Sequence, residues 1–130
     1  MILDTSFLID VMRGKPSSKE LLQRLIEKGT PITITAPSVF ELFSGITQSS
    51  KPILEKEKVQ TILKHQAQWP LEEESAELGG TIYGKLAQQG QTIEAIDAMI
   101  AAIALTHHEP VLTANVKHFS RIPGLNVETY

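Results

Sequence analysis

The stretch of sequence that decides the fold is Met1-Ile2-Leu3-Asp4-Thr5-Ser6-Phe7-Leu8-Ile9-Asp10-Val11-Met12. A short apolar run leads directly into an aspartate, two hydroxyl residues and a second apolar run. This pattern is typical of a buried strand that enters a helix, so Asp4 is expected at the carboxyl end of the strand. Open α/β sheets bind their ligands at that end. Asp4 or Thr5 would also serve as an ordinary N-cap, and this stretch alone leaves both interpretations open.

Strand-like and helix-like segments alternate along the rest of the chain. Further strands are predicted over residues 32–35 and 111–113, with an edge strand over 126–128 and a short extended piece over 69–71. Helices are predicted over residues 6–13, 17–28, 53–66, 73–89 and 95–106, and another begins after residue 36. Such alternation predicts an α/β fold, a three-layer α/β/α sandwich around a mostly parallel sheet. We expect a single domain over residues 1–130.

Composition excludes several classes of protein. The 130 residues are 42% hydrophobic and contain no apolar run near the length of a membrane span, so no membrane association is expected. The absence of cysteine excludes disulfides, thiolate zinc sites and cysteine nucleophiles. No basic leader precedes the first strand, so a cytoplasmic location is expected. The net charge of −3 argues against binding nucleic acid by bulk electrostatics.

Asp97 is the strongest chemical signal in the sequence. Ten of the twelve residues from Ala95 to Thr106 are apolar, and a helix that is apolar all round is buried on most sides. An ionised carboxylate there costs several kcal/mol unless it is paired or bound to a metal. No basic residue lies one turn away, and Glu94 adds repulsion. The pattern favours a cation site, with a strand-end cap or a distant lysine partner as the alternative.

Other oxygen-bearing side chains are expected to converge on Asp97. Asp4 and Asn115 each follow a short apolar strand, and Glu41 lies in the first turn of the helix after the second strand. The carboxyl ends of parallel strands share one edge, so these side chains meet there. Carboxylate and amide oxygens suit a hard divalent cation such as Mg²⁺ or Mn²⁺. Glu41 also has the spacing of a capping box with Ser38, and the two roles are compatible.

The neighbouring polar residues have more modest expected roles. Thr5, Ser6 and Thr113 lie beside the predicted site and are expected to orient its carboxylates. Asp10 is interpreted as a surface residue. The histidines show no metal-ligand spacing, and the adjacent pair His107 and His108 is interpreted as the structural end of a helix.

Four segments in register carry a resemblance to a known family. They are Asp4-Thr5-Ser6-Phe7-Leu8-Ile9-Asp10, Glu41-Leu42-x-x-Gly45, Ile96-Asp97-Ala98-x-Ile100-Ala101-Ala102 and Leu112-Thr113-x-Asn115-x-x-x-Phe119. In this order and at these separations the chain resembles the PIN-domain family, and most closely the VapC toxin ribonucleases of toxin–antitoxin pairs. The ending Arg121-Ile122-Pro123-Gly124-Leu125-Asn126-Val127 is similar to that of the family as well.

The resemblance implies a site, a reaction and partners. Asp4, Glu41 and Asp97 would be the acidic metal ligands of an endoribonuclease that depends on Mg²⁺ or Mn²⁺ and hydrolyses RNA phosphodiester bonds with metal-activated water. Asn115 stands where many members have a fourth aspartate, and its uncharged amide leaves open whether a second metal binds. An RNA substrate, a small cognate antitoxin and a homodimer are implied too. The candidates for steering RNA are Arg13, Lys15, Lys51, Lys117 and Arg121.

Other functions fit the sequence less well. A receiver-type signalling domain needs a phospho-accepting aspartate after a middle strand, whereas the second strand here ends at Thr35-Ala36. A phosphatase built on Asp-x-Asp is excluded because Ser6 stands two residues after Asp4. A non-catalytic PIN-fold module that binds RNA or protein is the remaining alternative. Asn115 supports that module, and the three retained carboxylates oppose it.

Overall fold

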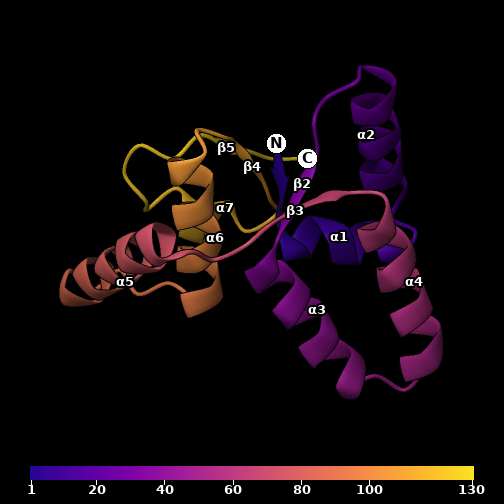
Figure 1. Cartoon of the computed structure of the whole chain (residues 1–130), viewed down its shortest axis with the longest axis horizontal. Coiled ribbons are helices and arrows are strands. Elements are labelled where there is room, and N and C mark those ends of the chain that lie inside the picture. The colour runs from indigo at the N-terminus through magenta and orange to yellow at the C-terminus, as the bar shows by residue number, and fades with distance from the viewer.

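A five-stranded sheet, parallel throughout, forms the centre of the computed structural model, which describes residues 1–130 (Figure 1). The strands are β1 (Ile2–Leu3), β2 (Thr33–Thr35), β3 (Ala67–Trp69), β4 (Val111–Leu112) and β5 (Val127–Glu128), in the spatial order β3-β2-β1-β4-β5. Ile2 is in register with Thr33 on one side and with Val111 on the other. β1 is therefore the central strand, and Asp4 emerges at the middle of the carboxyl edge.

Seven helices cover the sheet. They are α1 (Thr5–Met12), α2 (Pro16–Glu27), α3 (Ala36–Thr47), α4 (Pro52–Lys64), α5 (Glu73–Gln88), α6 (Ala95–Thr106) and α7 (Val116–Phe119). No helix among them combines the length and the apolar character that crossing a membrane requires. The layers and the parallel sheet confirm the predicted α/β/α sandwich.

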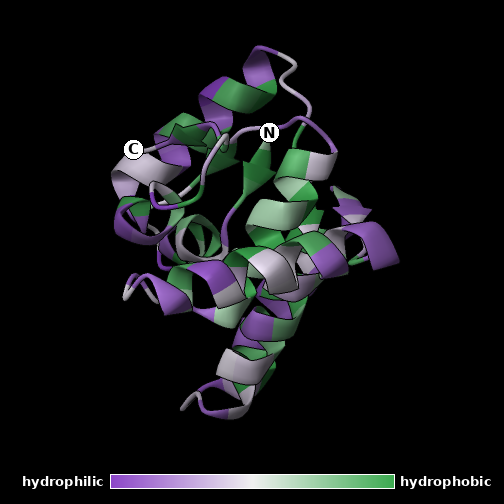
Figure 2. Ribbon diagram, turned by 90° about the vertical axis from the view of Figure 1, so that its left-hand side faces the viewer, coloured by the Kyte–Doolittle hydropathy of each residue, from purple (hydrophilic) through white to green (hydrophobic).

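Two hydrophobic cores lie on opposite faces of the sheet, because successive strand side chains point to opposite sides. Ile2 and Val111 face α5, α6 and α7, whereas Leu3 and Leu112 face the layer made by α1 to α4. Figure 2 shows the result, with hydrophobic strands at the centre and hydrophilic positions on the outer sides of the helices. Beyond the carboxyl edge of the sheet, α3 from one layer contacts α6 from the other.

The contact between α5 and α6 depends on a small residue. A Cβ atom at Gly79 would lie 3.2 Å from the backbone oxygen of Ala98 and 3.3 Å from Ala102 Cβ. Both distances are shorter than ordinary van der Waals contacts between carbon side chains and their neighbours. Glycine therefore sets how closely α5 approaches the helix that carries Asp97.

The capping box predicted for Ser38 and Glu41 is wrong. Thr35 is the N-cap of α3, and its Oγ1 accepts a hydrogen bond from the backbone N–H of Ser38 at 3.3 Å. Ser38 thus lies inside the helix, and Glu41 lies in its second turn rather than its first. Helix α2 begins at Pro16, one residue before its predicted start at residue 17, because proline has no N–H to satisfy and its φ suits a first helical position.

Strand β3 and helix α7 were absent from the predicted strands and helices. β3 ends at Trp69, where only a short extended piece was expected, and pairs with β2 over three residues. Two of its three residues are exposed. Such an edge strand has no continuous apolar run for periodicity to detect.

Candidate metal centre

Asp4 is held at the centre of the carboxyl edge by two hydroxyl groups. Its side chain follows β1 and is only 3% exposed. Ser6 Oγ donates to Asp4 Oδ2 at 2.6 Å, and Thr113 Oγ1 donates to the same oxygen at 2.7 Å. No protein group donates to Oδ1. The two donors therefore fix the carboxylate and leave one oxygen free.

A chain of hydrogen bonds continues from Asp4 to the other acidic residues. Thr113 Oγ1 accepts from the backbone N–H of Asn115 at 2.8 Å. Asn115 in turn directs its amide nitrogen Nδ2 to Asp97 Oδ2 at 2.9 Å. Ser6, Thr113 and Asn115 are thus brought together with both aspartates, and Asn115 faces Asp97 with a donor rather than with an oxygen.

Asp97 is the third residue of α6, and its side chain is almost fully buried, as its apolar helix predicts. Its Oδ2 also lies 2.8 Å from Nδ1 of His118, a residue that the sequence did not single out. Burial raises the pKa of Asp97, the hydrogen bond from His118 offsets part of that rise, and the nearby charges of Asp4 and Glu94 add to it. No periodic signal in the sequence marks His118, because the helix that carries it, α7, has only four residues.

Glu41 completes the set from α3. Burial raises the pKa of its carboxyl group, and the charges of Asp4 and Asp97 raise it further. The nearby Thr5 hydroxyl lowers the pKa of Glu41 and so offsets part of this rise. Thr5 Oγ1 is itself buried and has no hydrogen-bond partner within ordinary distance. Glu41 accepts no hydrogen bond on either oxygen. The three carboxylates therefore repel one another electrostatically, and none of them has a lysine or arginine partner.

These side chains fit a divalent cation by their chemistry. In this geometry no three acidic or histidine side chains lie close enough together to coordinate one metal ion. The free carboxylate oxygens of Asp4, Glu41 and Asp97 are hard ligands of the kind that Mg²⁺ and Mn²⁺ prefer. The orphaned Thr5 hydroxyl is a further polar atom at the same edge.

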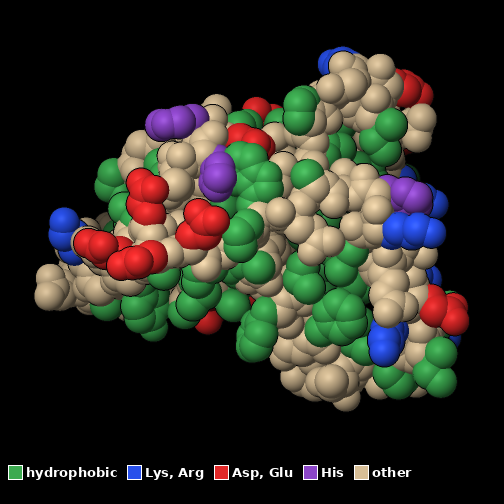
Figure 3. Space-filling view, in the orientation of Figure 1, with side chains coloured by type: hydrophobic (Ala, Val, Ile, Leu, Met, Phe, Trp, Pro, Cys, Tyr) green, Lys and Arg blue, Asp and Glu red, His purple; other side chains and the backbone are tan.

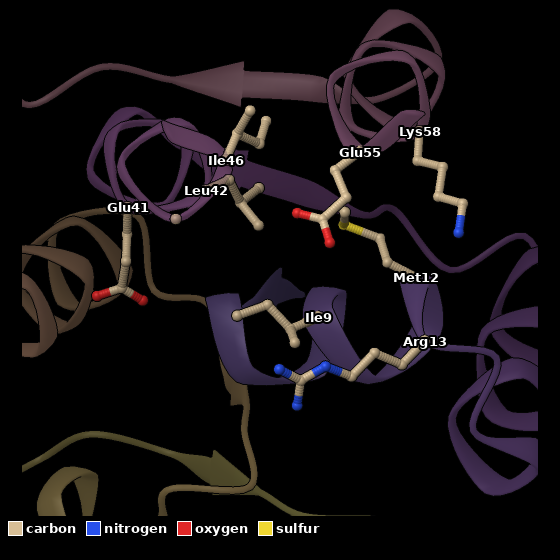
Figure 4. Close-up of a pocket in the computed structure, with 9 residues that line it drawn as sticks. Ile9, Met12, Arg13, Glu41, Leu42, Ile46, Glu55 and Lys58 are labelled. Carbon is tan, nitrogen blue, oxygen red and sulfur yellow. The ribbon is translucent and has the colours of Figure 1, made fainter. Parts of the chain in front are cut away.

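A cavity of about 220 Å³ lies between α1, α3 and α4, and Glu41 is the one residue of the candidate site that lines it. Glu41 stands at one end and Lys58 at the other, with Arg13 on the α1 side (Figure 4). Among the basic residues predicted to steer RNA, only Arg13 lines this cavity. Lys15 is paired with Asp10 at 2.8 Å, and Arg121 Nη1 donates to the Thr92 carbonyl at 2.9 Å.

Asp10 lies near the surface, as expected, and makes two side-chain hydrogen bonds there. Its Oδ2 accepts from Lys15 Nζ at 2.8 Å and from the Tyr130 hydroxyl at 2.9 Å. The Tyr130 ring packs edge-on against Phe7, with the two ring centroids 4.8 Å apart. These hydrogen bonds, that of Lys15 first, lower the pKa of Asp10. The carboxylate therefore ties Tyr130 to α1 and takes no part in the acidic cluster.

Comparison with known proteins places this geometry in context. The profile of the PIN domain matches residues 1–125. Ribonuclease VapC19 of Mycobacterium tuberculosis is 31% identical, with 95% of each chain covered. Ribonuclease VapC1 of Rickettsia felis is 33% identical, over 99% of this chain and 95% of its own. The crystal structure of VapBC2 from Rickettsia felis bound to a promoter DNA fragment superposes with a TM-score of 0.88, at 25% identity, over 99% of this chain and 97% of that one.

Proposed function

The chain belongs to the PIN-domain family and is a toxin ribonuclease of the VapC type, and on this premise we propose that its RNA cleavage depends on Mg²⁺ or Mn²⁺ held by Asp4, Glu41 and Asp97. The observation that carries the proposal is the set of free carboxylate oxygens at one sheet edge, with the pKa of Glu41 and of Asp97 raised and no basic residue to pair with them. A bound cation supplies a Lewis acid that activates water and offsets charge on the phosphate.

The surrounding residues prepare the site. Ser6 and Thr113 fix Asp4, while Asn115 holds Asp97 through its amide. We assign Asn115 this orienting role rather than that of a charged fourth ligand. Thr5 adds a buried hydroxyl beside Glu41.

The substrate is RNA, and the cavity beside Glu41 supports a path for it. Arg13 and Lys58 line that cavity together with Glu55, and no acidic side chain forms a salt bridge with either basic residue. Cations without a salt-bridge partner attract phosphate groups, and Glu41 at the cavity end connects this path to the proposed metal ligands. A non-catalytic binding module would not need free carboxylate oxygens converging beside such a path.

An antitoxin partner belongs to the same function, and we propose a homodimer as well. Exposed apolar side chains support the existence of partner surfaces, namely Phe40, Ile53, Leu54 and Tyr83. Figure 3 shows hydrophobic side chains gathered over α3, between an acidic region near α5 and basic side chains along α4. Sedimentation of the purified protein tests the dimer, and a monomer at high micromolar concentration would contradict it.

Cleavage of RNA by the purified protein tests the metal dependence. We expect cleavage with Mg²⁺ or Mn²⁺, loss of cleavage in excess EDTA and recovery when the cation is restored. Asp4→Asn, purified in parallel, controls for contaminating ribonucleases because it removes one ligand charge without changing the side-chain shape. Undiminished cleavage in EDTA would rule out the metal mechanism. A protein that binds RNA with either cation but never cleaves it would be the non-catalytic module.

A further inference from the structure

The Asp97 carboxylate is held by two donors on one oxygen. Asn115 Nδ2 lies 2.9 Å from Asp97 Oδ2, and His118 Nδ1 lies 2.8 Å from it. No protein group donates to Oδ1. Asp4 is held in the same way, with Ser6 and Thr113 both on its Oδ2. Both aspartates thus have one oxygen engaged by the protein and one oxygen free.

The contact between His118 and Asp97 defines which ring nitrogen makes the hydrogen bond. His118 Nδ1 also lies 2.9 Å from Asn115 Nδ2, so the ring tautomer decides which group donates here. An ionised carboxylate can only accept hydrogen bonds, and we therefore infer that both Nδ1 and the Asn115 amide donate to Asp97 Oδ2. Nε2 then has no part in holding Asp97. The side chain of His118 is 24% exposed, so the ring is half-buried beside its partner.

The backbone fixes the ring in this place. His118 lies on the short helix α7, for which Asn115 is the N-cap. The backbone N–H groups of His118 and Phe119 both donate to the Asn115 carbonyl, at 3.2 Å and 3.3 Å. Phe119 is fully buried in the core that α6 also lines. The packing of Phe119 therefore sets the position of His118 relative to Asp97.

We propose that His118 is a positioning residue for the metal centre, which holds Asp97 Oδ2 through Nδ1 so that Oδ1 faces the cation. This inference rests on the proposed function, because it assigns a role toward the same site. A carboxylate held in one orientation loses less conformational freedom when a cation binds. Removing a group that orients a metal ligand typically weakens metal affinity about 10–100-fold.

Three substitutions separate this role from others. In His118→Asn the side-chain amide nitrogen stands close to the former position of Nδ1. In His118→Gln the longer side chain carries the amide nitrogen out toward the former position of Nε2. His118→Ala removes both nitrogens. We expect the Ala and Gln variants to bind Mn²⁺ about tenfold or more weakly and the Asn variant to stay within about threefold of wild type.

The measurement is Mn²⁺ affinity by isothermal titration calorimetry on metal-free protein, accompanied by thermal melts without metal. His65→Ala, an exposed histidine at the end of α4, is the control and should match wild type. A purely structural role would lower the melting temperature of His118→Ala while leaving Mn²⁺ affinity unchanged, and that result would overturn the proposal. If the Ala variant fails to fold, the comparison of Asn with Gln carries the test.

The remaining outcomes are also decisive. Retained affinity in the Gln variant with loss in the Asn variant would show that His118 acts through Nε2, and the proposal would be wrong. Wild-type protein that binds no Mn²⁺ would overturn the metal centre itself and this inference with it. Normal wild-type binding with three unaffected variants would overturn only the role of His118.

Discussion

Thr113 Oγ1 donates to Asp4 Oδ2 at 2.7 Å, which joins the ends of β1 and β4 across 109 residues of sequence. The same hydroxyl accepts from the backbone N–H of Asn115 at 2.8 Å. A hydroxyl is the smallest side-chain group that donates and accepts at once. Thr113 therefore connects the positions of both aspartates, since Asn115 also contacts Asp97.

Thr113→Val should keep the shape of this side chain and remove both hydrogen bonds. The change leaves a backbone N–H without its acceptor and Asp4 with one donor fewer, so we expect a loss of about 1–3 kcal/mol in the free energy of unfolding. Urea titration measures it. Thr81→Val, at an exposed helical position, should change the stability by less than about 0.5 kcal/mol. Equal effects of the two substitutions would contradict the connecting role.

Asp97→Asn should abolish metal-dependent RNA cleavage. The substitution keeps the size of the side chain but removes the charge that offsets the cation. Metal catalysis supplies several kcal/mol of transition-state stabilisation, and each 1.4 kcal/mol is a factor of ten, so we expect a loss of at least about 100-fold in the cleavage rate. Wild-type cleavage by Asp97→Asn, measured over a range of Mn²⁺ concentrations, would remove Asp97 from the site.

Glu41→Gln should separate stability from activity. The pKa of Glu41 is raised in the folded protein, so the metal-free wild type loses stability as the pH rises from about 4.5 through that raised value. Glutamine does not titrate, and Ser38 is not the N-cap, so no capping interaction is lost. The metal-free variant should therefore equal the wild type at low pH and exceed it near neutral pH.

Urea titrations of both proteins across this pH range, without metal, measure the stability difference. Metal affinity and RNA cleavage of Glu41→Gln should collapse even where its stability is higher. A variant that is less stable than wild type at neutral pH yet fully active would show that Glu41 only supports the fold.

Gly79→Ala and Gly80→Ala should differ although they are neighbours in α5. Alanine stabilises an exposed helical position by about 1 kcal/mol relative to glycine. A Cβ added at Gly80 would have no atom within 4 Å, so the free energy of unfolding of Gly80→Ala should rise by that amount. The Cβ of alanine at position 79 would press against Ala98 and Ala102, so Gly79→Ala should destabilise the protein instead. Urea titration measures both, and an equal gain would show that α5 and α6 can move apart at no cost.

Tyr130→Phe should remove one hydrogen bond to Asp10 and keep the edge contact with Phe7. We expect a loss of about 1 kcal/mol at neutral pH, because the acceptor is charged but partly exposed. The pKa of Asp10 is lowered in the folded protein, so its contribution is present above about pH 3.8 and is lost as the pH falls through the lowered value. The difference from wild type should accordingly shrink in acid. A difference that stays constant down to strongly acid pH would rule out Asp10 as the partner.

The fold was predictable where hydrophobic pattern alone determines structure. The helix from Ala95 to Thr106 has the predicted ends, because its apolar run is long and a polar cluster follows it. β3 was not predicted as a strand because its pairing with β2 depends on tertiary contacts that no local period reveals. The capping box predicted at Ser38 is wrong for a local reason. Thr35 is the N-cap of α3, three residues before Ser38, and Pro16 likewise begins α2 one residue earlier than predicted.

The acidic residues of the candidate site were predictable, and their partners were less so. Asp4 and Glu41 could be placed at one edge because parallel strands end together. His118 could not, because its role depends on α7, a four-residue helix that is too short to leave a periodic signal. The orientation of the Asn115 side-chain amide was equally unpredictable from the sequence. A sequence identifies the amide but not whether its oxygen or its nitrogen faces Asp97.

The meeting of α3 and α6 beyond the end of the sheet has a consequence for amide hydrogen exchange. These helices belong to different cores, and each contributes one carboxylate on either side of Asp4. A cation held by all three would add a cross-link between the two helical layers, beside the sheet and the direct contact of α3 with α6. Addition of Mn²⁺ should therefore slow exchange around Glu41 in α3 and around Asp97 in α6 together, whereas the far turns of α2 and α5 keep their metal-free rates.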